Sequence, residues 1–216
     1  MKKSMNITFN KNIIAIAFTV LHIIILVLNI DIKLPYFQNF RYTINSLVTD
    51  LIPLIIPVLV LTFLFTLNKE YKLKKWLLPI AFGIKIIISF FTLCSNFTII
   101  DLGVSESTYA VMLTYSGLIF IASVFMFIGT LLDFKYINFL KYGALSCAIL
   151  NLAAFIFDFI AVGGFEYFKR VPAGTPALNL LVLTEILTCV FFYIGISVLT
   201  INKDRDDSLS HQNQSI

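Results

Sequence analysis

Two carboxylates, Asp158 and Glu185, stand inside long apolar stretches and are the residues of this chain best placed to do chemistry. An ionisable side chain at the centre of a membrane-spanning helix costs at least about 2.5–3.5 kcal/mol, so it usually has a reason to be there. Each lies sixteen residues from the end of its stretch that the topology below places in the cytoplasm, a height of roughly 24 Å. We therefore expect the pair to share a depth on neighbouring antiparallel helices and to bind a proton or a cation.

Three further polar residues extend this candidate site. Asn151 precedes Asp158 by seven residues and so occupies the same helix face. Asp50 and Asn96 lie at a comparable outer level on the second and third stretches. Together these residues predict a net-acidic pocket that opens outward between the second, third, fifth and sixth helices.

Each acidic residue also has a structural interpretation. A carboxylate in the first turn of a helix, as expected for Asp50, is stabilised by the helix dipole without any functional role. Asp158 and Glu185 could be protonated carboxyls that hydrogen-bond across helices. Pro53 and Pro57 each remove one backbone hydrogen bond, which predicts a kinked second helix.

Lys85 and His22 form a second polar level, each roughly 13 Å from the cytoplasmic end of its helix. Lysine side chains lean toward the helix N-terminus, so Lys85 can extend to the inner headgroups. We favour that interpretation over pairing with Asp158 or Glu185, and we keep Lys85 as a candidate binding residue. A packed core histidine is the favoured interpretation of His22, because no second histidine accompanies it.

The composition requires a membrane to position these residues. Of the 216 residues, 59% are hydrophobic and 13% are charged, with a mean hydropathy of +0.92, whereas soluble domains carry about a quarter charged residues. A membrane-spanning helix needs about 20 apolar residues. Six stretches qualify and predict an all-α, polytopic membrane protein with six transmembrane helices in one bundle: 13–30, 47–67, 76–100, 109–132, 142–162 and 178–201.

The basic residues orient this bundle. With the N-terminus inside, the cytoplasmic loops hold eleven lysines and arginines and the outer loops hold four, which predicts that both termini are cytoplasmic. The net charge of +4 is largely this topological signal and does not indicate nucleic acid. The first stretch runs into Asn29 and Asp31 without a signal-peptide cleavage site, so we expect it to be retained. We expect one domain over residues 1–201 and a disordered cytoplasmic tail over 202–216.

The fourth stretch has the composition of a packing helix. Small residues let helix backbones approach closely in a membrane. Those in this stretch are Ser116, Gly117, Ala122, Ser123 and Gly129.

Signatures of known catalytic sites are absent from the sequence. It contains no Walker loop, G-x-S-x-G, H-E-x-x-H or C-x-x-C motif, and the three cysteines have no metal-ligand spacing. We expect no cofactor and no metal. In size and topology alone the chain resembles the membrane substrate-binding subunits of energy-coupling-factor vitamin transporters. Their Ala-x-x-x-Ala seam in the first helix is not matched, since Ala15 and Ala17 are two apart, and no residue roles carry over.

Three functions remain open at this point. The first is a non-catalytic binding or transport component that takes a proton, a cation or a cationic small molecule in the acidic pocket. The second is an accessory or immunity-type membrane protein that acts through protein or lipid contacts. The third is a membrane enzyme that uses Asp158 and Glu185 as acid and base. The lipid bilayer is a partner in every case, other membrane subunits are candidates, and the composition suggests a bacterial cytoplasmic membrane.

Overall fold

The computed structural model describes residues 12–33, 40–67, 74–98, 106–131, 136–161 and 178–200, and every regular element within them is an α-helix. The described part of the chain therefore confirms the all-α fold class. The helices are α2 (Ile13–Lys33), α3 (Phe40–Thr66), α4 (Lys74–Thr98), α5 (Glu106–Thr130), α6 (Ile137–Ala161) and α8 (Leu178–Ser197).

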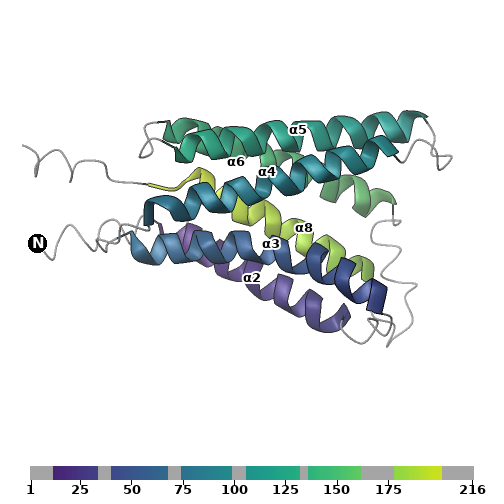
Figure 1. Cartoon of the computed structure of the whole chain (residues 1–216), viewed down its shortest axis with the longest axis horizontal. Coiled ribbons are helices and arrows are strands. Elements are labelled where there is room, and N and C mark those ends of the chain that lie inside the picture. Colours follow the sequence, from purple (N-terminus) through teal and green to yellow (C-terminus); the bar gives the residue numbers. More distant parts are fainter. Residues whose placement is uncertain are drawn as a thin grey trace, which may run out of the picture.

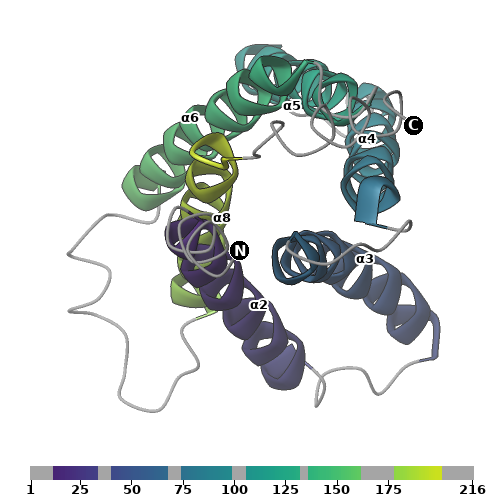
Figure 2. The same cartoon turned by 90° about the vertical axis from the view of Figure 1, so that its left-hand side faces the viewer.

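The six helices lie alongside one another as a bundle (Figure 1). Each packs against the helices that precede and follow it in sequence, and α8 packs against α2, so the order α2–α3–α4–α5–α6–α8 closes on itself. Figure 2, which looks along the helices, shows this ring. Helices on different parts of the ring can therefore present side chains to a common interior.

One end of the ring holds both the start of α2 and the end of α8, and we call it the proximal end. The amide of Asn12 joins them: its Nδ2 donates to the Thr200 carbonyl at 3.0 Å, and its Oδ1 accepts from the Thr200 N–H at 2.9 Å. Asn12 is buried. The pair of hydrogen bonds satisfies backbone groups at a helix end that no intrahelical partner can reach.

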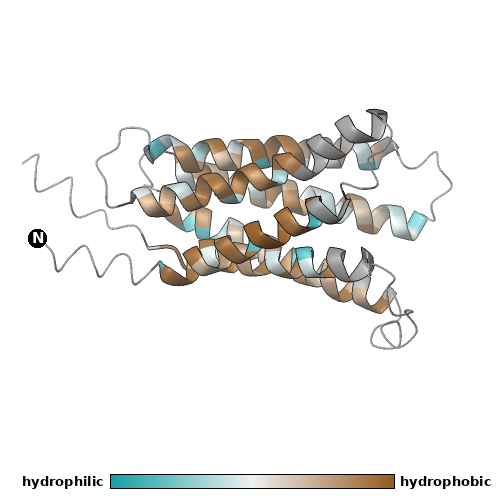
Figure 3. Ribbon diagram, turned by 90° about the horizontal axis from the view of Figure 1, so that it is seen from below, coloured by the Kyte–Doolittle hydropathy of each residue, from teal (hydrophilic) through white to brown (hydrophobic). Residues whose placement is uncertain are grey.

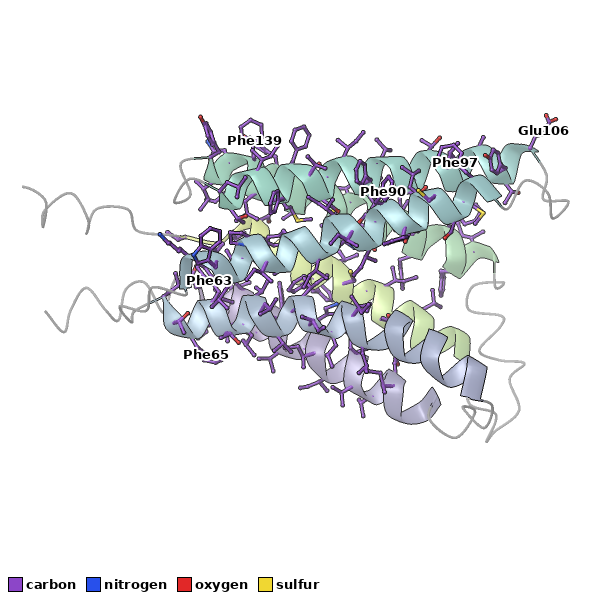
Figure 4. All side chains as sticks on the ribbon, in the orientation of Figure 1. Phe63, Phe65, Phe90, Phe97, Glu106 and Phe139 are labelled. Atoms are coloured by element: carbon purple, nitrogen blue, oxygen red, sulfur yellow. The ribbon has the colours of Figure 1, made fainter. Side chains whose placement is uncertain are left out.

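The outer surface of the ring is apolar. Phe63 and Phe65 on α3 illustrate the pattern: Phe63 is 1% exposed, whereas Phe65 is 53% exposed on the outside (Figure 4). Colouring by hydropathy shows apolar residues over much of the described helices, with hydrophilic residues near some helix ends (Figure 3). Such a surface suits lipid and not water.

Within the described ranges, four helices are long and apolar enough to cross a membrane: α2, α4, α5 and α6. The chain is therefore a multi-pass membrane protein. The apolar parts described in α3 and α8, Leu51–Thr66 and Leu183–Ser197, are shorter. Proline lies inside two of the helices, at Pro53 and Pro57 in α3 and at Pro79 in α4.

Two helix boundaries differ from the sequence expectation in ways that affect the candidate site. α3 begins at Phe40 instead of residue 47, so Asp50 lies almost three turns inside the helix and the first-turn dipole argument does not apply to it. α6 begins at Ile137 instead of residue 142, since Leu140 continues the helix and is fully buried. Helix ends predicted from apolar stretches are misplaced in this way because polar or aromatic residues at the membrane edge fold into helices as readily as apolar ones.

The tightest helix contact lies between α5 and α6. A Cβ added to Gly143 would come within 2.8 Å of the Met126 backbone nitrogen, and one added to Gly129 would overlap the backbone of Leu140. These contacts confirm the prediction that residues 109–132 form a packing helix. Gly117 is the exception, because no atom lies within 4 Å of a Cβ at that position.

Candidate binding cavity

The ring borders a partly open pocket of about 210 Å³, which we call the cavity. Its wall is formed by residues of α2, α3, α4, α6 and α8, which include the four helices that the sequence assigned to a pocket. The polar or titratable lining residues are His22, Lys85, Asn151, Glu185, Cys189 and Tyr193, and the apolar ones are Leu26, Pro53, Ile56, Pro57, Ile186 and Phe192. At about 30 Å³ per molecule, this volume equals that of roughly seven waters.

Glu185 on α8 is held by a residue that the sequence did not single out. Asn29 on α2 donates from Nδ2 to Glu185 Oε2 at 2.7 Å. Asn29 is 3% exposed, and its Oδ1 is the one buried side-chain polar atom in the described residues that lacks a hydrogen-bond partner. A buried carbonyl without a donor is costly. The Asn29–Glu185 pair therefore keeps capacity for one more donor.

His22 is a buried histidine with defined neighbours. Its Nδ1 lies 3.1 Å from Thr188 Oγ1, and its ring stacks on that of Phe192 with centroids 5.2 Å apart. The Thr188 hydroxyl has one proton and lies 3.0 Å from the Glu185 carbonyl. With that proton donated to the carbonyl, the hydroxyl accepts from His22 Nδ1–H, and this is the tautomer that we expect. In the neutral ring this leaves Nε2 as an acceptor at the cavity wall. The packing predicted for His22 is therefore present, and the residue also lines the cavity.

Lys85 reaches into the ring from α4. Its Nζ lies 5.8 Å from the centroid of the Tyr193 ring on α8, which is 3% exposed, and this distance is within the range of a cation–π contact. Among the described residues no ion pair joins Lys85 to a carboxylate. The ammonium thus lies beside a buried ring in the interior, which differs from the headgroup contact that we favoured from the sequence.

Asn151 on α6 lines the cavity, as the sequence suggested. Its Nδ2 donates to the Cys147 carbonyl one turn earlier at 2.7 Å, and its Oδ1 accepts from the Tyr115 hydroxyl at 3.5 Å. These bonds fix the amide against its own helix and against α5. Asn151 is thereby a pre-positioned polar group on the wall opposite α3.

Asn96 does not join this cavity. Its Nδ2 donates to the Met112 carbonyl of α5 at 3.4 Å, so the residue links two neighbouring helices. Asp50 and Asp158 lie on α3 and α6, but their side chains fall outside the described residues, and a binding role for either stays a prediction.

The helix bounds also change the height calculation for the two central carboxylates. Asp158 lies three residues before the end of α6, whereas Glu185 lies seven residues after the start of α8. The α6 residue that shares the cavity with Glu185 is Asn151, seven residues and roughly 10 Å further toward the proximal end than Asp158. The equal depth expected for the pair was counted from residues 142 and 201, whereas α6 begins at Ile137 and α8 ends at Ser197.

Sequence reasoning missed the polar partners on α2. His22 and Asn29 are seven residues apart, so they lie on one helix face. That spacing marked a polar stripe that faces α8. We had assigned Asn29 to the end of the first helix, and α2 in fact continues to Lys33.

No group of three or more His, Cys, Asp or Glu side chains in the described ranges is arranged to hold a metal ion. The three cysteines are free thiols. Comparisons with protein-family models, with curated proteins and with solved structures give no match. The site must therefore be interpreted from its own geometry: a membrane-embedded bundle that borders a small, partly open cavity with one basic and one acidic residue among its described lining residues.

Proposed function

We propose that this protein is a non-catalytic binding or transport component that takes a small polar solute into its interior cavity. The observation that carries the proposal is the pair of charged residues, Lys85 and Glu185, on one cavity wall inside an apolar shell. Charged groups inside a membrane bundle are expensive and typically mark a solute or ion pathway. The net-acidic pocket expected from the sequence stays a prediction, because the side chains of Asp50 and Asp158 lie outside the described residues. The described wall holds one charge of each sign, Lys85 and Glu185.

We further propose that all six helices cross the membrane and that both termini are cytoplasmic. Two observations support this topology: the start of α2 and the end of α8 meet at the proximal end, and lysine and arginine are concentrated in the loops of that side. A reporter that is active only in the cytoplasm should work when fused after Ser208 or within residues 68–75. The same reporter within residues 163–177 should be silent, and activity there would contradict the topology.

Asp50 and Asp158 fit the same proposal as outer carboxylates. Each lies on the distal side of a lining residue of its own helix, Asp50 before Pro53 and Asp158 after Asn151. We propose that they attract the positively charged part of a solute toward the cavity.

The test is water access to the cavity wall. Ile186 lines the cavity, whereas Leu152, next to Asn151 on α6, is 42% exposed on the outer surface. In a variant whose three native cysteines are replaced, Ile186→Cys should react with a small, charged, water-soluble thiol reagent. Leu152→Cys, which faces lipid, is the matched control and should stay unlabelled.

If neither introduced cysteine reacts with the reagent, the binding proposal is wrong. It would favour the accessory or immunity-type function, in which the outer surface and loops carry the activity. Labelling of Ile186→Cys alone would support the cavity as a solute site.

A further inference from the structure

We infer that the solute is a short zwitterion, with an ammonium group and an anionic group separated by about two or three carbons. This inference rests on the proposed binding function and names the class of ligand. It starts from the fact that Lys85 and Glu185 line the same cavity without forming an ion pair.

The Lys85 ammonium and the Glu185 carboxylate lie toward different ends of the cavity. Tyr193, whose ring lies under the Lys85 ammonium, follows Glu185 by eight residues on α8, which is a rise of roughly 12 Å. The Glu185 side chain is held toward the distal end by Asn29, the direction in which α8 side chains lean. The basic group therefore marks the proximal part of the cavity and the acidic group its distal part.

Charge balance selects among ligand classes. In a low-dielectric interior an unpaired charge is unfavourable, and it is compensated by an opposite charge at hydrogen-bonding distance. Among the described residues, a simple cation would compensate Glu185 and leave Lys85 without an opposite charge, and a simple anion would do the reverse. A zwitterion compensates both at once.

The spacing sets the length of that zwitterion. We take the rise of roughly 12 Å between Tyr193 and Glu185 on α8 as the scale of the gap between the two charges. A charge-assisted hydrogen bond of about 2.8 Å at each end then leaves on the order of 6 Å between the ligand's own charges. This matches an ω-amino carboxylate such as β-alanine or γ-aminobutyrate, and also phosphoethanolamine. The cavity volume of about 210 Å³ accommodates molecules of this size.

The remaining polar groups fit such a ligand. The ammonium group needs several acceptors, and Glu185 supplies its carboxylate at the cavity wall. Pro57 cannot donate to the carbonyl of Pro53, so that carbonyl is released from the helix of the α3 wall. Lys85 supplies the donor for the anionic group.

A chain-length series tests the inference on the full-length protein in detergent micelles. Glycine, β-alanine, γ-aminobutyrate and 6-aminohexanoate are compared as stabilisers in thermal unfolding and as protectants of Ile186→Cys. We expect both effects to peak at β-alanine or γ-aminobutyrate. Propylamine and propionate each carry one of the two charges. With either compound, the same stabilisation or protection should require a concentration at least about tenfold higher.

Charge-removal variants supply the second arm. Lys85→Met should abolish the advantage of the zwitterions and make propylamine as effective as they are, and Glu185→Gln should do the same for propionate. Lys75→Met and Glu106→Gln are matched controls on exposed residues of α4 and α5, and they should preserve the wild-type order (Glu106 is labelled in Figure 4).

The outcomes separate this inference from the proposed function. A wild-type preference for propylamine or propionate over every zwitterion would overturn the inference and leave the binding function standing. If none of the compounds stabilises the protein and Ile186→Cys is also not labelled, both the zwitterion inference and the proposed binding function are wrong. Stronger protection by phosphoethanolamine than by the carboxylates would support the zwitterion site and identify a lipid headgroup as its source.

Discussion

The α5–α6 contact and the α2–α8 contact differ in where their polar side chains form hydrogen bonds. On α5, Ser116 and Thr130 donate to carbonyls of their own helix, and glycine brings α5 and α6 together. On the other side of the ring, His22 and Asn29 of α2 bond across to α8. The serine and threonine hydroxyls of the first contact bond locally, although Tyr115 of α5 also donates to Asn151 of α6 at 3.5 Å. The polar groups of the second contact depend on a partner helix.

This difference separates a scaffold from a site. Local hydrogen bonds leave nothing for a ligand to satisfy, whereas the cross-helix pair Asn29–Glu185 retains an unused acceptor. Close backbone packing leaves no room beside Gly129 and Gly143, whereas the α2–α8 side borders the cavity. We therefore expect substitutions at the α5–α6 contact to act on stability alone and those on the cavity side to act on binding as well as on stability.

The largest effect should come from the glycines of the scaffold. Gly143→Ala and Gly129→Ala each place a methyl group against backbone atoms that cannot rotate away, so we expect a destabilisation of about 3 kcal/mol or more, the upper end for overpacking. The folded yield and the unfolding free energy in mixed micelles measure it. Gly117→Ala is the control on α5, because its Cβ meets nothing and alanine favours the helix by up to about 1 kcal/mol. Equal behaviour of the three variants would contradict close packing.

The next effect concerns Glu185 and its partner. Glu185→Leu removes the acceptor of Asn29 Nδ2 and leaves a buried amide unsatisfied, which should destabilise the fold by about 1–3 kcal/mol. The double variant with Asn29→Leu should recover most of this loss, since replacing both partners by apolar groups is nearly neutral. A double variant less stable than Glu185→Leu alone would show that the hydrogen bond is not what holds the two helices.

The sequence predicts the helices well and the site only in part, for reasons that individual residues illustrate. Six apolar stretches gave six helices because the composition of a spanning helix has few alternatives. Lys85, Asn151 and Glu185 were found because polar residues at membrane depth are conspicuous. The height of a residue is less certain, because it is measured from a boundary that is uncertain by a few residues.

Partner choice is the part that a single sequence does not contain. Nothing in the sequence indicates that Asn96 bonds to α5, or that Lys85 extends to Tyr193 across the ring. Both follow from the rotation of each helix about its axis, which depends on all its neighbours at once. The role of the glycines was easier to predict, because a small residue allows close helix packing whichever helix it faces.

A smaller effect should come from the bond between Thr188 and His22. Thr188→Val keeps the shape of the side chain and removes the acceptor of His22 Nδ1–H, so a loss of about 1 kcal/mol is expected. Thr62→Val is the control, because the Thr62 hydroxyl bonds to its own helix at Val58. Nitrogen NMR on histidine-labelled protein, with His211 substituted, should show a protonated Nδ1 in the wild type. An unprotonated Nδ1 there would contradict the tautomer.

The smallest effect should come from the Ser89–Ser123 contact between α4 and α5, although its 3.1 Å oxygen–oxygen distance matches that of the His22–Thr188 bond. Ser89 Oγ also lies 2.8 Å from the Lys85 carbonyl, and Ser123 Oγ lies 2.7 Å from the Ile119 carbonyl. Two hydroxyls have two protons for these three contacts. A bond between the serines therefore requires one of them to release its own carbonyl.

That competition sets the expected magnitude. Interhelical hydrogen bonds in membrane proteins average about 0.6 kcal/mol in double-mutant cycles, and each serine here already has a local acceptor, so the coupling between Ser89→Ala and Ser123→Ala should be at or below that value. Ser116→Ala serves as the control partner, because Ser116 bonds only within α5 and its coupling to Ser89 should be zero within error. A Ser89–Ser123 coupling well above 1 kcal/mol would mean that α4 and α5 depend on a cross-helix bond. The distinction between a locally satisfied scaffold and a cross-bonded cavity side would then fail at this contact.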